Sequence, residues 1–86
     1  MKIEFFAPPS RTVSVIADWP NLRIPVVGDH LDLVFRSEDV DVMMNETLLP
    51  PDNGTTVSVA GAVVDVIWRR VPSGNDAFWS VTVRLK

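Results

Sequence analysis

The stretch that decides the fold runs from residue 56 to residue 85. Its first part reads Thr56-Val57-Ser58-Val59-Ala60-Gly61-Ala62-Val63-Val64-Asp65-Val66-Ile67-Trp68-Arg69-Arg70. A turn-forming segment follows, Val71-Pro72-Ser73-Gly74-Asn75-Asp76, and then an alternating one, Phe78-Trp79-Ser80-Val81-Thr82-Val83-Arg84-Leu85. Both flanking parts are rich in β-branched and aromatic residues, which suit a pleated, half-buried surface. The pattern predicts a long β-hairpin with strands at 57–70 and 77–85.

The apolar face of the first of these strands changes parity near Ala60-Gly61. Before this point the inward residues are Val57 and Val59. After it they are Ala62, Val64, Val66 and Trp68. One extra residue in a β-bulge reconciles the two registers, and Gly61 is the expected position. A bulge there would bend the strand, as a small barrel requires.

This register leaves aliphatic side chains on the outer face of the sheet. Val63, Ile67 and Val34 are expected to point outward, away from the core. Exposed aliphatic residues in this number indicate that part of the outer face is covered. The cover is either a terminal segment of the chain or another subunit.

Shorter strands are expected to pack on this hairpin. Residues 2–6, 11–17 and 31–36 each alternate apolar and polar side chains. The segment 38–48 fits both a helical period and, at 40–44, the alternation of a strand. The alternation at 40–44 favours a strand there.

A family resemblance appears at Pro25-Val26-Val27-Gly28-Asp29, which leads into the alternating residues 31–36. This arrangement resembles the start of a strand in small SH3-like or split β-barrels, including short bacterial and phage proteins of that type. The resemblance and the long hairpin imply an all-β fold, a small barrel of about 5–6 antiparallel strands forming one domain over residues 1–86. The chain lacks the further glycines of KOW-type nucleic-acid modules, so their activity is not implied.

Composition narrows the function classes. The chain has 86 residues, enough for one domain, and eight basic against eleven acidic residues give a net charge of −3. This balance disfavours partners that are held by phosphate contacts, such as nucleic acid or an anionic membrane surface. No apolar run approaches the roughly 18 residues that cross a membrane, and the first residues do not form a signal peptide. A cytoplasmic protein is expected.

The sequence offers no clear catalytic or metal-binding set. His30 is the only histidine, and beside Asp29 it could serve as a general base. Cysteine and tyrosine are absent, the glycines are isolated, and the acidic residues do not form a calcium-binding loop. We therefore expect His30 to be a polar residue at the start of a strand. No enzyme activity, metal or cofactor is expected.

Five residues are candidates for binding a partner. Trp19 lies in a loop with Pro20 and is expected either to contact a partner or to close one end of the barrel. Trp68 and Trp79 are expected to pack in the core or across the hairpin. The candidate binding residues are Trp19, Val63, Ile67, Arg69 and Arg70. The two arginines could alternatively serve only to solubilise the hairpin end.

Three functions remain, in decreasing order of support. The first is a protein–protein interaction or assembly module that binds a protein partner or itself through a strand edge or an apolar face. The second is a nucleic-acid-binding barrel, by analogy of fold. The third is an enzyme or small-molecule binder built around Asp29 and His30.

Overall fold

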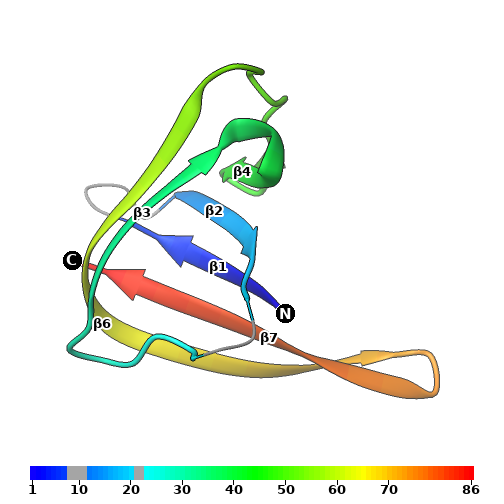
Figure 1. Ribbon diagram of the computed structural model, residues 1–86. Helices are drawn as coiled ribbons and strands as arrows, with labels where there is room; N and C mark the ends of the chain where they lie inside the picture. The colour runs from blue at the N-terminus through cyan, green and yellow to red at the C-terminus, as the bar shows by residue number, and fades with distance from the viewer. Residues whose placement is uncertain (8–11, 21–22) are drawn as a thin grey trace.

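The structure, a computed structural model, describes residues 1–7, 12–20 and 23–86, and these residues form an all-β fold (Figure 1). The predicted all-β class is confirmed. Three short strands come first, followed by a 3-10 turn, two more short strands and a long hairpin. They are β1 (Lys2–Phe6), β2 (Val13–Asp18), β3 (His30–Arg36), η1 (Ser37–Asp39), β4 (Val40–Met44), β5 (Thr47–Leu48), β6 (Thr56–Ser73) and β7 (Asp76–Leu85).

The strands form one open, mixed sheet with the order β3-β6-β7-β1-β2-β4-β5. β1 runs parallel to β7 and antiparallel to β2, and the remaining pairs among the described residues are antiparallel. The prediction of an entirely antiparallel sheet with fewer strands was wrong on two points. It missed the short β5, and it missed the insertion of β1 between β7 and β2, which joins segments far apart in the sequence.

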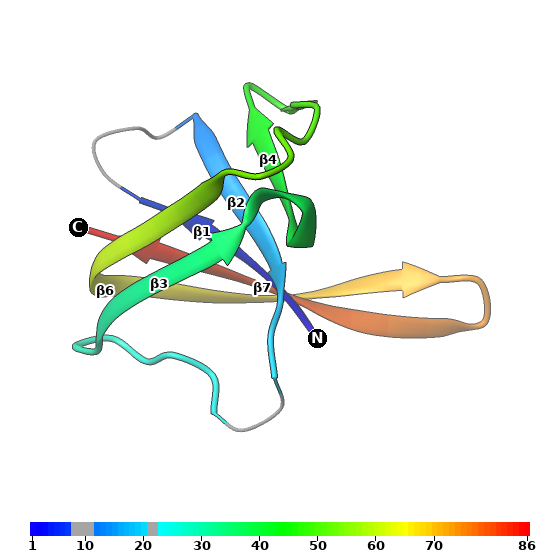
Figure 2. The ribbon, with the colours of Figure 1, turned by 45° about the horizontal axis from the view of Figure 1, so that its top comes forward.

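β6 is long because it serves two neighbours in succession. Residues 56–62 pair with β3, and residues 63–73 pair with β7. The strand bends sharply beside the C-terminus, where one pairing replaces the other (Figures 1 and 2). Gly61 lies at this bend with φ +144°, and a Cβ there would lie 2.7 Å from the carbonyl oxygen of Lys86. Only glycine fits this approach of two backbones.

The predicted β-bulge exists, but it lies after the bend. The register of β6 against β7 shifts between Val63 and Asp65, so that Val64 has no partner. Val63 is therefore buried, with 2% of its surface exposed, whereas Val64 is 47% exposed. The prediction placed Val63 and Val64 on the wrong faces, because it put the extra residue of the bulge at Gly61. In the structure Gly61 bends the strand without inserting a residue. Val66 and Trp68 lie opposite the buried Val83 and Val81, on the core side as predicted.

The core lies between the two halves of the bent sheet. Its buried apolar residues come from β1, β2, β4, β6 and β7, and the side chains of Leu31, Leu33 and Phe35 on β3 pack against it. The alternation predicted for residues 31–36 is thereby confirmed. The buried set is Ile3, Phe5, Val15, Ala17, Val40, Val59, Val63, Val81, Val83 and Leu85. The buried residues of the described strands thus belong to one cluster.

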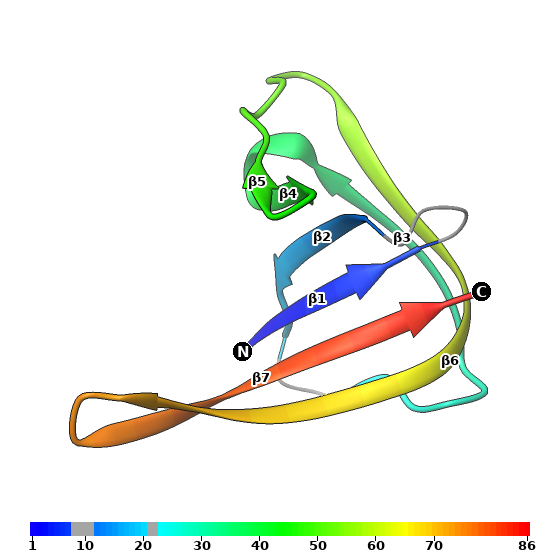
Figure 3. The ribbon, with the colours of Figure 1, turned by 180° about the vertical axis from the view of Figure 1, so that it is seen from behind.

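The ambiguous segment is a strand at 40–44, as the alternation indicated. It pairs with β2 on one side and with the short β5 on the other, which is visible in Figure 3. The turn between β4 and β5 places Asn45 and Glu46 at φ 51° and 66°, as two-residue hairpin turns of the primed type require. Among the described residues, no helix is long and apolar enough to span a membrane.

The end of the β6–β7 hairpin extends beyond the rest of the sheet (Figures 1, 2 and 3). β3 pairs with β6 only as far as Ala62, and β1 pairs with β7 only from Val81 onward. We call residues 67–80 the arm. Its strands reach Ser73 and Asp76, further than predicted, and its loop begins with Gly74 at φ +60°.

Candidate functional site

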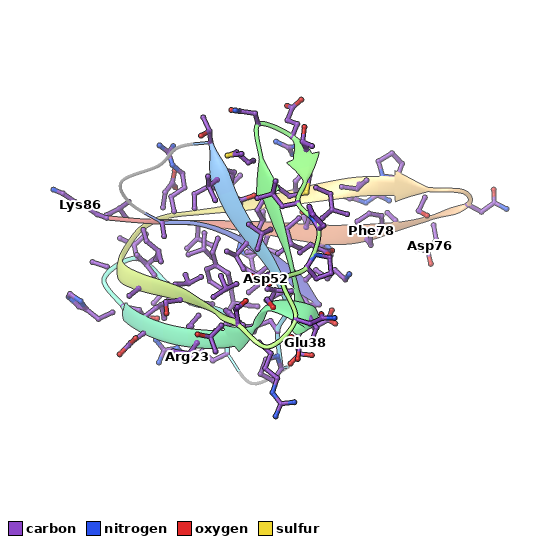
Figure 4. The ribbon with its side chains drawn as sticks, turned by 90° about the horizontal axis from the view of Figure 1, so that it is seen from above. Arg23, Glu38, Asp52, Asp76, Phe78 and Lys86 are labelled. Carbon is purple, nitrogen blue, oxygen red and sulfur yellow. The ribbon has the colours of Figure 1, made fainter. Side chains whose placement is uncertain are left out.

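The arm carries large apolar side chains that the rest of the molecule leaves exposed. Ile67, Trp68, Phe78 and Trp79 are 41%, 49%, 53% and 54% exposed, whereas Val81 and Val83 further along β7 are fully buried. In Figure 4 Phe78 and Asp76 lie along the arm, well away from the other labelled residues. Exposed apolar residues gathered on one element mark a contact surface more strongly than scattered ones do.

The strand register divides the arm into two sides. Trp68 lies opposite the buried Val81, and Arg70 lies opposite Trp79, so these side chains share the face that continues from the core. The rings of Trp68 and Trp79 meet edge to face, with centroids 6.1 Å apart and an interplanar angle of 79°. We call Trp68, Arg70 and Trp79 the Trp side. The predicted cross-strand packing of the two tryptophans is confirmed, but they lie outside the core.

The opposite side of the arm belongs to the outer face of the sheet. Ile67 lies opposite Thr82, which in turn lies beside the outward-facing Glu4 of β1. Arg69 faces the same way two residues further along the strand, and Val71 and Phe78 form the next pair. We call Ile67, Arg69, Val71 and Phe78 the Phe side.

The arm is a two-stranded ribbon with a free edge on each strand. Among the described residues, neither β3 nor β1 pairs with any part of residues 67–80. A two-stranded hairpin alone is marginally stable in water, and free edges can pair with another chain. The edge-to-face tryptophan pair adds about 0.5–1.5 kcal/mol to the ribbon. The arm is thus a preformed element whose surface and edges are open to a partner.

A groove of about 610 Å³ lies on the outer face of β1, β2 and β4. Two apolar side chains, Phe6 and Met43, and two carboxylates, Glu4 and Glu46, line it together with polar residues. The hydroxyl of Ser14, a buried side chain, donates a hydrogen bond of 2.7 Å to Glu4 Oε2. The described residues that line it are Glu4, Phe6, Thr12, Ser14, Met43, Asn45 and Glu46. This groove combines apolar contact area with negative charge.

Side-chain contacts hold Trp19 in place. Its half-buried ring lies 5.6 Å from that of Phe5, centroid to centroid, and its Nε1 donates a hydrogen bond of 2.8 Å to the carbonyl of Arg23. The Arg23 guanidinium contacts both carboxylate oxygens of Asp29 at 2.6 Å. The backbone N–H of Val26 also donates to this carboxylate, and these contacts hold the pKa of Asp29 below its usual value.

Backbone hydrogen bonds join this loop, between β2 and β3, to the bent part of β6. The N–H of Val63 donates a hydrogen bond of 2.8 Å to the carbonyl of Asp29, and the N–H of Gly28 donates to the carbonyl of Val63. His30 is exposed at the start of β3 and lines a shallow hollow with Trp19 and Arg23. Within the described part of the chain, no three acidic or histidine side chains are placed to hold a metal ion. The contacts indicate a structural role for the loop.

The predicted binding residues are therefore not brought together. Ile67, Arg69 and Arg70 are exposed on the arm, Trp19 is half buried against Phe5, and Val63 is buried. The placement of Val63 on the outer face was wrong, because the bulge follows it rather than precedes it.

Sequence reasoning did not single out Trp68, Phe78 and Trp79 as surface residues. One signal could have found them. The predicted hairpin is much longer than the other predicted strands, so its far end would have no neighbours to cover it.

Comparison of the chain with known protein families, with curated proteins and with solved structures gives no match. Function therefore rests on the geometry of the chain itself.

Proposed function

We propose that this protein is a protein–protein interaction module and that the Trp side of the arm is its binding surface. The observation that carries the proposal is the pair of half-exposed tryptophans in contact at the end of an uncovered ribbon. Tryptophan and arginine are enriched among the residues that dominate binding energy at protein interfaces. Trp68, Arg70 and Trp79 together offer both types on one side.

The geometry suits binding without a large ordering penalty. The indole rings already hold each other across the strands, so a partner need not immobilise them individually. Burial of their exposed faces would supply the hydrophobic term, and the Arg70 guanidinium could pair with a carboxylate of the partner. Removal of such an anchor typically weakens binding by about 2–4 kcal/mol.

The proposal includes a finer assignment of the fold, a small SH3-like or split β-barrel that is open between β3 and β5. Its support is the bend at Gly61, which lets both halves of the sheet share one core. In such a fold the arm is an extension of the hairpin beyond the barrel wall. The barrel would then act as the rigid base that presents the arm.

The test is a comparison of partner capture by the wild-type protein and two variants, using extract of the source cells. The double variant Trp68→Ser/Trp79→Ser should lose a specific partner. Val34→Ser, at a 64% exposed side chain on β3, is the matched control and should retain it. Val34→Ser should melt close to the wild-type temperature. The double variant should melt several degrees lower, because it loses the edge-to-face pair, but it should remain folded. A partner captured equally by all three proteins would contradict the proposal.

A second candidate is binding of single-stranded nucleic acid. Arg70 lies opposite Trp79 and on the same side as Trp68, so indole rings and a cation share one surface. Bases stack on such aromatic rings while the cation contacts the backbone. The net charge of −3 places this function second. Quenching of tryptophan fluorescence by an oligonucleotide at low salt, reversed by added salt, would favour it, and unchanged fluorescence would exclude it.

A further inference from the structure

We propose that the Phe side of the arm docks into the groove of a second copy of this chain, so that two copies pair outer face to outer face. This inference goes beyond the proposed function, which uses the opposite side of the arm. Each copy would contribute one arm and one groove, and the two contacts would be identical. Such an isologous pair closes on itself and leaves no contact unused.

The two surfaces lie on the same face of the sheet. Ile67 on the arm, Thr82 on β7 and Glu4 on β1 stand side by side in the strand register, and Glu4 is part of the groove lining. The arm extends away from the body (Figures 1 and 3). The groove is lined by residues of β1, β2 and β4 and of the segments that adjoin them. A two-fold axis lying between two facing outer faces can therefore place each arm over the groove of the other copy.

The charges of the two surfaces are complementary. The Phe side carries Arg69, whereas the charged residues of the groove within the described part of the chain are Glu4 and Glu46. Among the described residues, neither Arg69 nor Glu46 takes part in an ion pair. Docking would bring the unpaired guanidinium to two carboxylates at the edge of an apolar contact. Charge arrangements of this kind select the partner and its orientation.

The apolar parts are complementary as well. Phe78 is 53% exposed and Ile67 is 41% exposed on the arm. Phe6 and Met43 present apolar surface in an open groove of about 610 Å³. Contact between these two sets would cover exposed apolar surface on both copies at once. It would also give the ribbon the neighbouring layer that it lacks within one copy.

Charge also favours a second copy over nucleic acid on this face. The two glutamates of the groove would repel a phosphate backbone. The same glutamates attract an arginine, and the Phe side of the arm carries Arg69. The occupant that fits both the charge and the apolar content of the groove is therefore this arm.

The experiment measures the monomer–dimer equilibrium of the full chain by sedimentation over a wide concentration range. The wild-type protein should dimerise, and Phe78→Ser and Arg69→Glu should each raise the dissociation constant roughly tenfold or more. Trp79→Ser, on the opposite side of the arm, is the matched control and should leave the dimer unchanged. Circular dichroism should show that every variant is folded.

A charge exchange provides the decisive step. Glu46→Arg alone should weaken the dimer as Arg69→Glu does. An equimolar mixture of the Arg69→Glu and Glu46→Arg proteins should form a mixed dimer. In each of its two contacts, position 69 of one copy and position 46 of the other then carry opposite charges. A monomeric wild-type protein, a dimer insensitive to these changes, or a mixture without recovery would overturn the inference.

These outcomes are independent of the proposed function. Loss of partner capture in the Trp68→Ser/Trp79→Ser variant is measured on the other side of the arm. A strictly monomeric protein that still captures a partner through its tryptophans would overturn the dimer and leave the interaction module standing. A dimeric protein whose partner capture does not depend on the two tryptophans would overturn the interaction module and leave the dimer standing.

Discussion

The two ends of the β6–β7 hairpin have similar sequences and opposite surroundings. At the covered end, Val81 and Val83 alternate with polar residues and are fully buried. In the arm, Trp79 continues the same face of the same strand, yet it is 54% exposed. The difference lies in the neighbours, since β1 pairs with β7 only from Val81 onward. A strand pattern states which face a side chain takes, whereas the neighbouring strands decide whether that face is buried.

The largest expected effect comes from two matched phenylalanine substitutions. Phe5→Ala removes a 1% exposed side chain beside Val83 and should lower the free energy of unfolding by about 3–5 kcal/mol. Phe78→Ala, at a 53% exposed side chain in the arm, should change it by less than about 0.5 kcal/mol at protein concentrations at which the chain is monomeric. Urea denaturation measures both values. Similar losses for the two variants would mean that the arm is part of the core.

A smaller effect is expected from two matched glycine substitutions. Gly61→Ala places a Cβ 2.7 Å from the Lys86 carbonyl oxygen at a backbone conformation that alanine rarely adopts. It should lower the free energy of unfolding by about 2–4 kcal/mol, combining strain with displacement of the C-terminal residue. Gly74→Ala, in the arm loop with open space around it, should lower it by only about 1–2 kcal/mol.

The melting temperatures of the two glycine variants show which substitution destabilises the protein more. A Gly74 variant less stable than the Gly61 variant would place the structural constraint in the arm rather than at the bend. A tolerant Gly61 would mean that β6 can bend without the close approach to Lys86.

The smallest expected effect concerns pH. The pKa of Asp29 is lowered by the Val26 N–H and the Arg23 guanidinium, so the unfolded chain binds this proton more readily. The resulting stabilisation is present above the usual value of 3.8 and is lost as the pH falls through the folded-state pKa. Because the Asp29–Val63 backbone contact ties this loop to β6, acid should loosen the covered end first.

Amide exchange at Val63, followed by nuclear magnetic resonance, measures this loosening between neutral and acidic pH. Exchange should accelerate in acid beyond the intrinsic trend in the wild-type protein, and Asp29→Asn should lack the excess. Asp76→Asn, in the arm, is the control and should behave as the wild type does. An identical excess in all three proteins would assign the pH dependence to other carboxylates.

Much of the fold follows from local patterns. The strands at 2–6, 31–36 and 40–44 were predicted from alternation alone, and the hairpin was predicted within a few residues. These predictions succeed because a half-buried strand must alternate apolar and polar side chains whatever its neighbours are.

The position of the bulge was not predictable in the same way. Residues 57–64 are nearly all small or β-branched, so several registers satisfy the pattern. The register is decided by the close approach of Gly61 to Lys86, which joins distant parts of the chain. Exposure of the arm likewise depends on how far β1 reaches along β7. Both are properties of tertiary pairing. For that reason the face of Val63 and the exposure of Trp68 and Trp79 were not predicted, although the cross-strand packing of the two tryptophans was.

The parallel pairing of β1 with β7 sets the order in which the molecule can form. β1 can join β2 as soon as both are synthesised, since they are close in the sequence. Its other partner, residues 81–84, is synthesised 78 residues later, since Ile3 pairs with Val81. Until then one edge of β1, in the middle of the sheet, has no partner strand, and β1 carries the largest core side chain, Phe5. The pairing of β1 with β7 joins residues far apart in the sequence, and its formation should set the folding rate.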